Sequence, residues 1–279
     1  MTHEREENIV SDPIIKDVEI IPMETRSTIS TRYRTVTKAI NREFRNIQSE
    51  TQYSLYVGSY GRGTAIDASD IDILVELPEE EYNRHDSMKG NGQSRLLQAV
   101  KEAIINAYPR SDVRADGQVV KINFSDGMRF EILPAFKNID WLGVSTYKYP
   151  DTNMGGNWRS TNPKAEQDAM KEKNKYSNEL LYDTCKHIRR IRSENYSSYH
   201  LSGIVIDSFV YVAMGDWHWL WAGEQPTSTT GDFENALLNY FQNQNIGYFS
   251  TLTAPGSGES VNLIDSIDCL GKVLKRMAE

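Results

Sequence analysis

The sequence predicts an α+β fold, in which strands and helices are mixed up to about residue 160 and helices alone follow. Short runs of branched apolar residues, such as IDILVEL at 71–77 and VVKINF at 119–124, are typical of strands. After residue 160, apolar residues instead recur every three or four positions, the period of a helix. We therefore divide the 279 residues into an N-terminal arm (1–25), a mixed core (26–160) and a helical lobe (161–279).

The core begins with a predicted helix from Ser27 to Ile47, with Ser27 or Thr28 as its cap. Strands are predicted at 53–57 and 71–77, a helix at 94–108, and further strands at 119–124 and 128–133. The turn Ser125-Asp126-Gly127 joins the last two strands as a hairpin, because Asp-Gly readily adopts positive φ angles. Past Pro134 the pattern predicts a loop up to about Pro163.

Four apolar stripes predict the helices of the second half. They begin near Leu181, Ile204, Phe233 and Ile264, and the second is apolar enough to be a buried helix. The aromatic run DWHWLW contains Trp217, Trp219 and Trp221, which we interpret as core or interface side chains of the helical lobe.

The net charge, the hydropathy and the cysteines of the sequence disfavour several classes of protein. The net charge of −8 disfavours a partner made of long nucleic acid, since such proteins usually present a basic surface. No apolar run reaches the roughly 18 residues of a membrane span, and no secretory signal is visible. Cys185 and Cys269 form neither a metal nor a disulfide pattern, so we expect a cytoplasmic protein.

Two aspartates at the start of the second strand carry the main chemical signal. Asp70 and Asp72 are spaced by two residues, so both carboxylates point to the same face of a strand, while Ile71 and Ile73 point to the core. Adjacent carboxylates repel each other unless a cation lies between them, and Mg²⁺ prefers such oxygen ligands. By itself, however, the pair is equally well explained as an exposed strand start.

A glycine-rich turn precedes these aspartates. Gly58 and Ser59 end a strand, and glycines allow backbone N–H groups to approach an anion. Ser59 and Ser69 add hydroxyl groups. A triphosphate held by this turn would offer oxygens to a metal on Asp70 and Asp72, although such a turn alone is more often an ordinary loop.

Glu131 supplies a third carboxylate. In MRFEIL, Phe130 and Ile132 take the core face, so Glu131 takes the opposite face of its strand. Two-metal phosphoryl or nucleotidyl transfer uses carboxylates of this kind, and a solvated strand face is the alternative.

Together these residues resemble a known family. Gly58-Ser59 followed by Asp70-Ile-Asp72 is similar to the GS…DxD signature of the DNA polymerase β-like nucleotidyltransferases. FEILPAF (130–136) resembles the strand that carries their third acid. GGNWRSTNP (155–163) resembles the following segment of the bacterial cGAS/DncV-like enzymes, the CD-NTases, which are related to oligoadenylate synthetases. The resemblance covers roughly residues 25–215, and it departs at Glu131, where the family commonly has Asp.

The resemblance implies a nucleotidyltransferase core that faces a helical lobe across a cleft. It implies two Mg²⁺ ions, with Mn²⁺ as the alternative, on Asp70, Asp72 and Glu131, and nucleoside triphosphates (ATP and others) on Gly58 and Ser59. It further suggests that Lys186 reaches the donor triphosphate. Tyr176 is a candidate to stack on a base, because an aromatic face accepts any base. A solvated basic face and ordinary packing are the alternatives for these last two residues.

The leading hypothesis is therefore a cyclic di- or trinucleotide synthase of anti-phage (CBASS) signalling that releases pyrophosphate. One alternative transfers the nucleotide to a protein, a tRNA or a small molecule. Another is an inactive nucleotide-binding regulator. No membrane or long nucleic acid is expected as a partner, and the sequence leaves open whether a regulatory protein binds.

Overall fold

The computed structural model describes residues 12–17, 21–67, 70–141, 143–243 and 251–278. The chain forms two compact units, one of residues 21–165 and one of residues 1–20 with 166–279. The predicted boundary at 160/161 lies five residues before the observed one at 165/166. The N-terminal segment differs from the separate arm that the sequence suggested. Residues 12–17 pack on the helical unit, and the first helix of the core starts at Met23.

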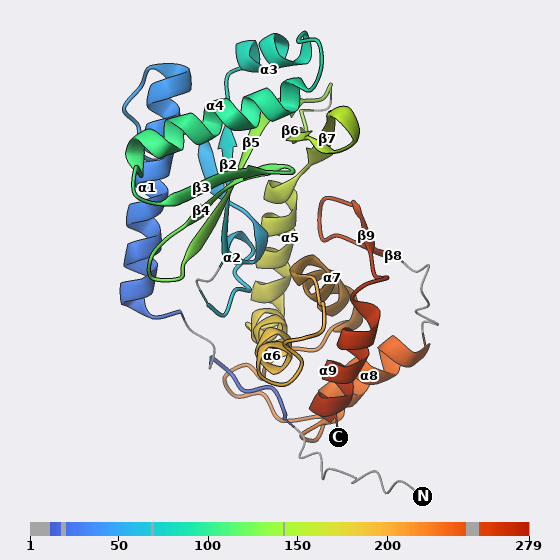
Figure 1. Ribbon diagram of the computed structural model, residues 1–279. Coiled ribbons are helices and arrows are strands. Elements are labelled where there is room, and N and C mark those ends of the chain that lie inside the picture. The colour runs from blue at the N-terminus through green and yellow to red at the C-terminus, as the bar shows by residue number, and fades with distance from the viewer. Residues whose placement is uncertain (1–11, 18–20, 68–69, 142, 244–250, 279) are drawn as a thin grey trace, which may run out of the picture. The chain divides into compact units, whose positions relative to one another are not determined.

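The core unit is built on a mixed seven-stranded sheet (Figure 1). Its strands follow the order β1-β2-β5-β4-β3, with β6 added to the second half of β5 and β7 to β6. Only the pair β2–β5 is parallel, and the other pairs are antiparallel. The strands are β1 Ser54–Tyr56, β2 Asp70–Glu76, β3 Asp112–Asp116, β4 Val119–Asn123, β5 Arg129–Ile139, β6 Ser145–Asp151 and β7 Asn157–Thr161.

Two long helices, α1 (Met23–Arg45) and α4 (Gly92–Ala107), cover one face of this sheet (Figure 1). Shorter helices α2 (Gly58–Gly61) and α3 (Glu79–Asp86) lie in the connections. The apolar stripes of the long helices meet the core-facing strand residues in one buried cluster. Its members include Ile29, Val36, Ile71, Ile73, Leu97, Val100, Ile104, Phe130 and Ile132. This packing fixes which face of β2 and β5 carries their charged side chains.

The hairpin predicted at Ser125-Asp126-Gly127 is confirmed. Strands β4 and β5 pair antiparallel, Gly127 has φ 88°, and the Phe124 N–H donates to the Met128 carbonyl at 2.9 Å. The predicted cap of the first helix is wrong. The helix begins after Pro22, and the Thr28 hydroxyl donates to the Glu24 carbonyl inside it.

The loop predicted between Pro134 and Pro163 is also wrong. Strand β5 continues to Ile139, and β6 and β7 follow as antiparallel partners. Most residues of β6 and β7 are half-buried or exposed, so these strands lack the apolar alternation by which a strand is predicted.

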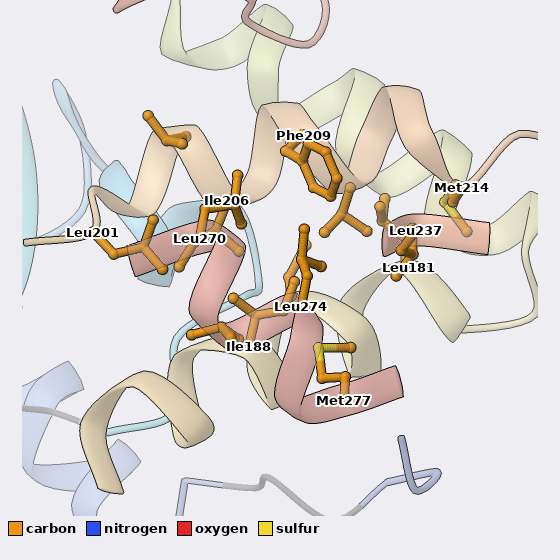
Figure 2. Close-up of a cluster of buried hydrophobic side chains, with 14 of the residues drawn as sticks. Leu181, Ile188, Leu201, Ile206, Phe209, Met214, Leu237, Leu270, Leu274 and Met277 are labelled. Atoms are coloured by element: carbon orange, nitrogen blue, oxygen red, sulfur yellow. The ribbon is translucent and has the colours of Figure 1, made fainter. Parts of the chain in front are cut away.

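The second unit contains five helices within the described residues, together with a short hairpin of β8 (Thr251–Thr253) and β9 (Ser260–Asn262). The helices are α5 Pro163–Tyr176, which starts in the core unit, α6 Leu180–Asn195, α7 Gly203–Ala213, α8 Asp232–Asn243 and α9 Ile267–Ala278. Figure 2 shows their shared core, in which Phe209 of α7 lies among leucines and methionines of the other helices. The four predicted stripes thus correspond to α6–α9, although Ile264 lies before α9 and is exposed.

An internal ion pair fixes the buried helix α7. Asp207 has no exposed surface, and its Oδ1 lies 2.8 Å from Nη1 of Arg189 on α6. Arg190, the next residue, pairs with Asp12 at 2.8 Å. Both arginines therefore serve packing within this unit. In the described part of the chain, no helix is long and apolar enough to cross a bilayer.

Candidate active site

The parallel pairing of β2 with β5 brings the three predicted acids to one face of the sheet. Asp72 is the direct neighbour of Glu131 in the strand register, and Asp70 is the neighbour of Arg129. Ile71, Ile73, Phe130 and Ile132 alternate with them and are fully buried on the other face. The predicted orientation of these side chains is thus confirmed, and residues far apart in sequence share one site.

The glycine turn lies against the same carboxylates. Gly58 opens the single helical turn α2 with φ +60°, and the Val57 N–H donates to the Asp72 carbonyl at 2.9 Å. A Cβ atom built on Gly58 would overlap with Oδ2 of Asp72. Only glycine therefore permits this approach, and the backbone of the turn lies directly beside the Asp72 carboxylate. Ser59 is the next residue of the turn, whereas Ser69 lies outside the described residues.

The close approach at Gly58 can be tested by stability. Gly58→Ala is expected to lower the free energy of unfolding by roughly 1–3 kcal/mol more than Gly117→Ala does. Gly117 is a matched control, because its φ of +59° imposes the same backbone strain while no atom lies within 4 Å of its added Cβ. Urea unfolding of both variants measures the difference, and equal losses would show that the Asp72 contact imposes no constraint.

Asp72 is electrostatically disfavoured as an anion. Burial, followed by the neighbouring charge of Glu131, raises the pKa of Asp72 from 3.8 to about 6. Asp70 raises it further, and only Arg62 acts in the opposite direction. A carboxylate in this position is stabilised by an added positive charge, which a bound cation would supply.

Two basic side chains that the sequence analysis did not assign to the site complete its surroundings. The Arg129 guanidinium binds Asp70 through two contacts, Nε–Oδ1 at 2.8 Å and Nη2–Oδ2 at 3.1 Å. Lys121 Nζ lies 3.3 Å from Oε1 of Glu131 and 2.8 Å from Asp116. Together with Asn123, these side chains line a cavity of about 250 Å³. Lys121 could have been predicted from the hairpin, because the register of β4 with β5 places it directly opposite Glu131.

The donor chemistry of the site fits Mg²⁺. Three carboxylates on one sheet face are oxygen ligands of the type that Mg²⁺ and Mn²⁺ bind. As the side chains stand, no three acidic, His or Cys side chains within the described residues are gathered closely enough to hold an ion. Asp70 and Glu131 are instead paired with Arg129 and Lys121. A metal would therefore have to replace these cations at the carboxylates.

The remaining two predicted residues belong to the helical unit. Lys186 lies on α6, the second helix after GGNWRSTNP rather than the first, and is half-buried. Tyr176 ends α5 and is 60% exposed, so it is not part of the apolar core. Their roles in nucleotide binding stay predictions.

The sequence matches a family model over more than half of its length. The model describes a Second Messenger Oligonucleotide or Dinucleotide Synthetase domain (SMODS) and matches residues 13–174. Comparison with curated protein sequences gives no match.

Several solved structures share the fold. One is the CdnE cyclic dinucleotide synthase of Elizabethkingia meningoseptica with GTP and Apcpp, with a TM-score of 0.61 and 14% identity over 91% of each chain. Another is the CD-NTase CdnG of Bradyrhizobium diazoefficiens in complex with GTP, with a TM-score of 0.62 and 13% identity over 92% of this chain and 84% of that one. The CdnE c-UMP-AMP synthase of Rhodothermus marinus, with Apcpp and Upnpp, gives 0.58 and 15% over 90% of each.

At such low sequence identities, these structures show that the fold is shared and no more. The family model adds a sequence match over the segment that contains the acids and the glycine turn. The chain therefore belongs to the Second Messenger Oligonucleotide or Dinucleotide Synthetase family, as the resemblance of its motifs to the CD-NTases predicted.

Proposed function

We propose that this protein joins nucleoside triphosphates into a cyclic di- or trinucleotide and releases pyrophosphate. One observation carries the proposal. The β2–β5 register sets Asp72 beside Glu131, and the Gly58 backbone lies against the same carboxylate. This arrangement combines an anion-binding turn with a cluster of acids, as nucleotidyl transfer requires. The relatives solved with GTP, Apcpp or Upnpp support nucleoside triphosphates as the substrates.

In this proposal Asp70, Asp72 and Glu131 hold two Mg²⁺ ions. Such ions neutralise the charge of the transferring phosphate and stabilise the attacking and leaving oxygens. The residues of the chain position the substrate. Gly58 and Ser59 hold the triphosphate through the turn.

The reaction is the attack of a ribose hydroxyl on an α-phosphorus. A new phosphorus–oxygen bond forms to the ribose, and the bond to the β-phosphate oxygen breaks, so pyrophosphate leaves. Glu131 lies beside Asp72 and, with the metal ions, would favour ionisation of the attacking hydroxyl by taking up its proton. Glu131 is a longer acid than the Asp that is common in the family, but it offers the same carboxylate oxygens.

Mass spectrometry of products formed from mixed ATP, GTP, CTP and UTP tests this function. We expect a cyclic oligonucleotide and pyrophosphate in the absence of any added acceptor. Transfer that occurs only when a protein, tRNA or small molecule is added would favour the alternative acceptor. Absence of pyrophosphate under all these conditions would favour an inactive regulator. The anti-phage role, which the resemblance implies, and the cytoplasmic location, which the cysteine pattern favours, are both part of the proposal.

Long nucleic acid is expected neither to stimulate this enzyme nor to bind it tightly. The chain carries 39 acidic against 31 basic residues, and two of its clustered arginines, Arg189 and Arg190, are already paired within the helical unit. Binding to a polymer depends on many free phosphate contacts, so it should be weak at physiological salt. Product formation with and without long duplex DNA or RNA measures the effect, and a stimulation of roughly tenfold by either would contradict it.

A further inference from the structure

One cavity of the helical unit has no place in the proposed chemistry. It has a volume of about 830 Å³, within the range of roughly 300–1,000 Å³ that is usual for small-molecule sites. All of its walls come from the helical unit, namely residues 13–14, Leu180, 216–220, 224, 226–231 and 233–234. None of the acids on β2 and β5 contributes to it.

Its aromatic wall is the DWHWLW segment, held in place by specific contacts. The Trp219 indole N–H donates to Oδ2 of Asp183 at 2.8 Å, and its backbone N–H donates to the Ser177 carbonyl at 3.1 Å. Trp217 packs against Phe233, with ring centroids 5.4 Å apart. These anchors make the wall a fixed surface. The electron-rich faces of such rings attract organic cations.

The charged groups of the wall are predominantly acidic. Asp216, Glu224 and Glu234 line the cavity, and His218 is the only basic side chain among its described lining residues. Nε2 of His218 lies 3.1 Å from Oε1 of Glu224, so Glu224 already has a partner among the lining residues. The wall stays net negative even when His218 is protonated.

Glu234 is the most informative of these acids. It is only 6% exposed, and its Oε1 accepts a hydrogen bond from the Ile14 N–H at 3.0 Å. Within the described part of the chain no Lys or Arg forms an ion pair with it. A buried carboxylate is costly unless a positive group compensates it, and the cavity gives such a group access.

The N-terminus of α8 adds a partial positive charge to the wall, which opposes the binding of a cation. Phe233 in the first turn of α8 and Gly231 just before that helix line the cavity, and a helix N-terminus carries a partial positive charge. Asp232, an acid in the first turn of α8, already offsets part of this charge. The full negative charges of Asp216 and Glu234 therefore outweigh the remaining dipole.

We infer that this cavity binds an organic cation, a guanidinium or ammonium head on an apolar stem, with the head at Glu234 and the stem along Trp217 and Trp219. The ligand could be supplied as a free small molecule or as the side chain of an arginine or lysine in a protein. Both share the same chemistry. The inference is independent of the reaction proposed for the core unit.

Calorimetric titration of the full chain with 1-butylguanidine and with its neutral isostere 1-butylurea tests the site at physiological salt. We expect saturable binding of butylguanidine at one site, with quenching of tryptophan fluorescence. The affinity for butylurea should be weaker than that for butylguanidine by roughly tenfold or more. A short blocked peptide with a single arginine distinguishes the source. Tighter binding of the peptide favours a protein side chain, and tighter binding of the free guanidine favours a small molecule.

Glu234→Gln is the decisive variant, because the glutamine carbonyl can still accept from Ile14 N–H while the charge is lost. It should weaken butylguanidine roughly tenfold and leave the thermal midpoint close to that of the wild type. Glu172→Gln removes an exposed acid of the same unit outside the cavity and should change nothing. Absence of saturable binding, equal binding of butylurea, equal binding by Glu234→Gln, or preferential binding of inorganic phosphate would each overturn the inference.

Discussion

The double variant Asp70→Asn with Asp72→Asn is expected to fold and to lose nucleotidyl transfer by roughly a thousandfold or more. Asn keeps the shape of Asp but removes the anionic oxygens that would hold Mg²⁺. The rate of pyrophosphate release from mixed triphosphates measures the loss. Preserved turnover would refute the assignment of the active site to the β2–β5 face.

Stability separates this effect from misfolding. The Asp72 carboxylate is disfavoured by burial and by Glu131, so replacing it with a neutral amide should not lower the free energy of unfolding. Wild-type protein should also gain thermal stability on addition of Mg²⁺, whereas the double variant should not. Asp112→Asn is a matched control on the same sheet, since Asp112 is paired with Arg114 and does not line the cavity.

Glu131→Gln is expected to reduce turnover by roughly a hundredfold or more, whereas Glu131→Asp should keep a measurable part of it. The charge, rather than the length of the side chain, is what this position requires. Glu131→Gln leaves Lys121 paired with Asp116 at 2.8 Å, so the substitution strands no buried cation.

Initial rates at saturating triphosphate and Mg²⁺ compare the two Glu131 variants. Unfolding curves that match the wild type would show that the loss lies in the chemistry. If Glu131→Gln turns over like the wild type, the third acid must come from another residue.

Much of the site was predictable because strand alternation is a strict rule. In DIDILVEL and MRFEIL, the buried Ile71, Ile73, Phe130 and Ile132 fix the direction of the acids between them. The partners of those acids were harder to predict. Arg129 contacts Asp70 only because β2 and β5 pair in parallel in one particular register, which no local pattern encodes.

The sequence analysis missed two strands and the packing of the N-terminal segment for a related reason. Strands β6 and β7 are largely half-exposed, so their sequences carry little apolar periodicity. Only the backbone hydrogen bonds of β6 to β5 and of β7 to β6 make them strands. The N-terminal segment shows the same limit. Ile14 is buried in the helical core, and its N–H finds Glu234 220 positions away, a contact that sequence spacing does not reveal.

The parallel pairing of β2 with β5 also has a consequence for how the protein is made. Asp70 and Arg129 are 59 positions apart, and α3, α4 and two further strands lie between them. Contacts that close such long loops form slowly, and they lower the folding rate more than the stability. During synthesis the carboxylates cannot be assembled before β5 has left the ribosome. A nascent or truncated chain that ends before residue 129 therefore has no acid cluster, however well its first helix and glycine turn have formed.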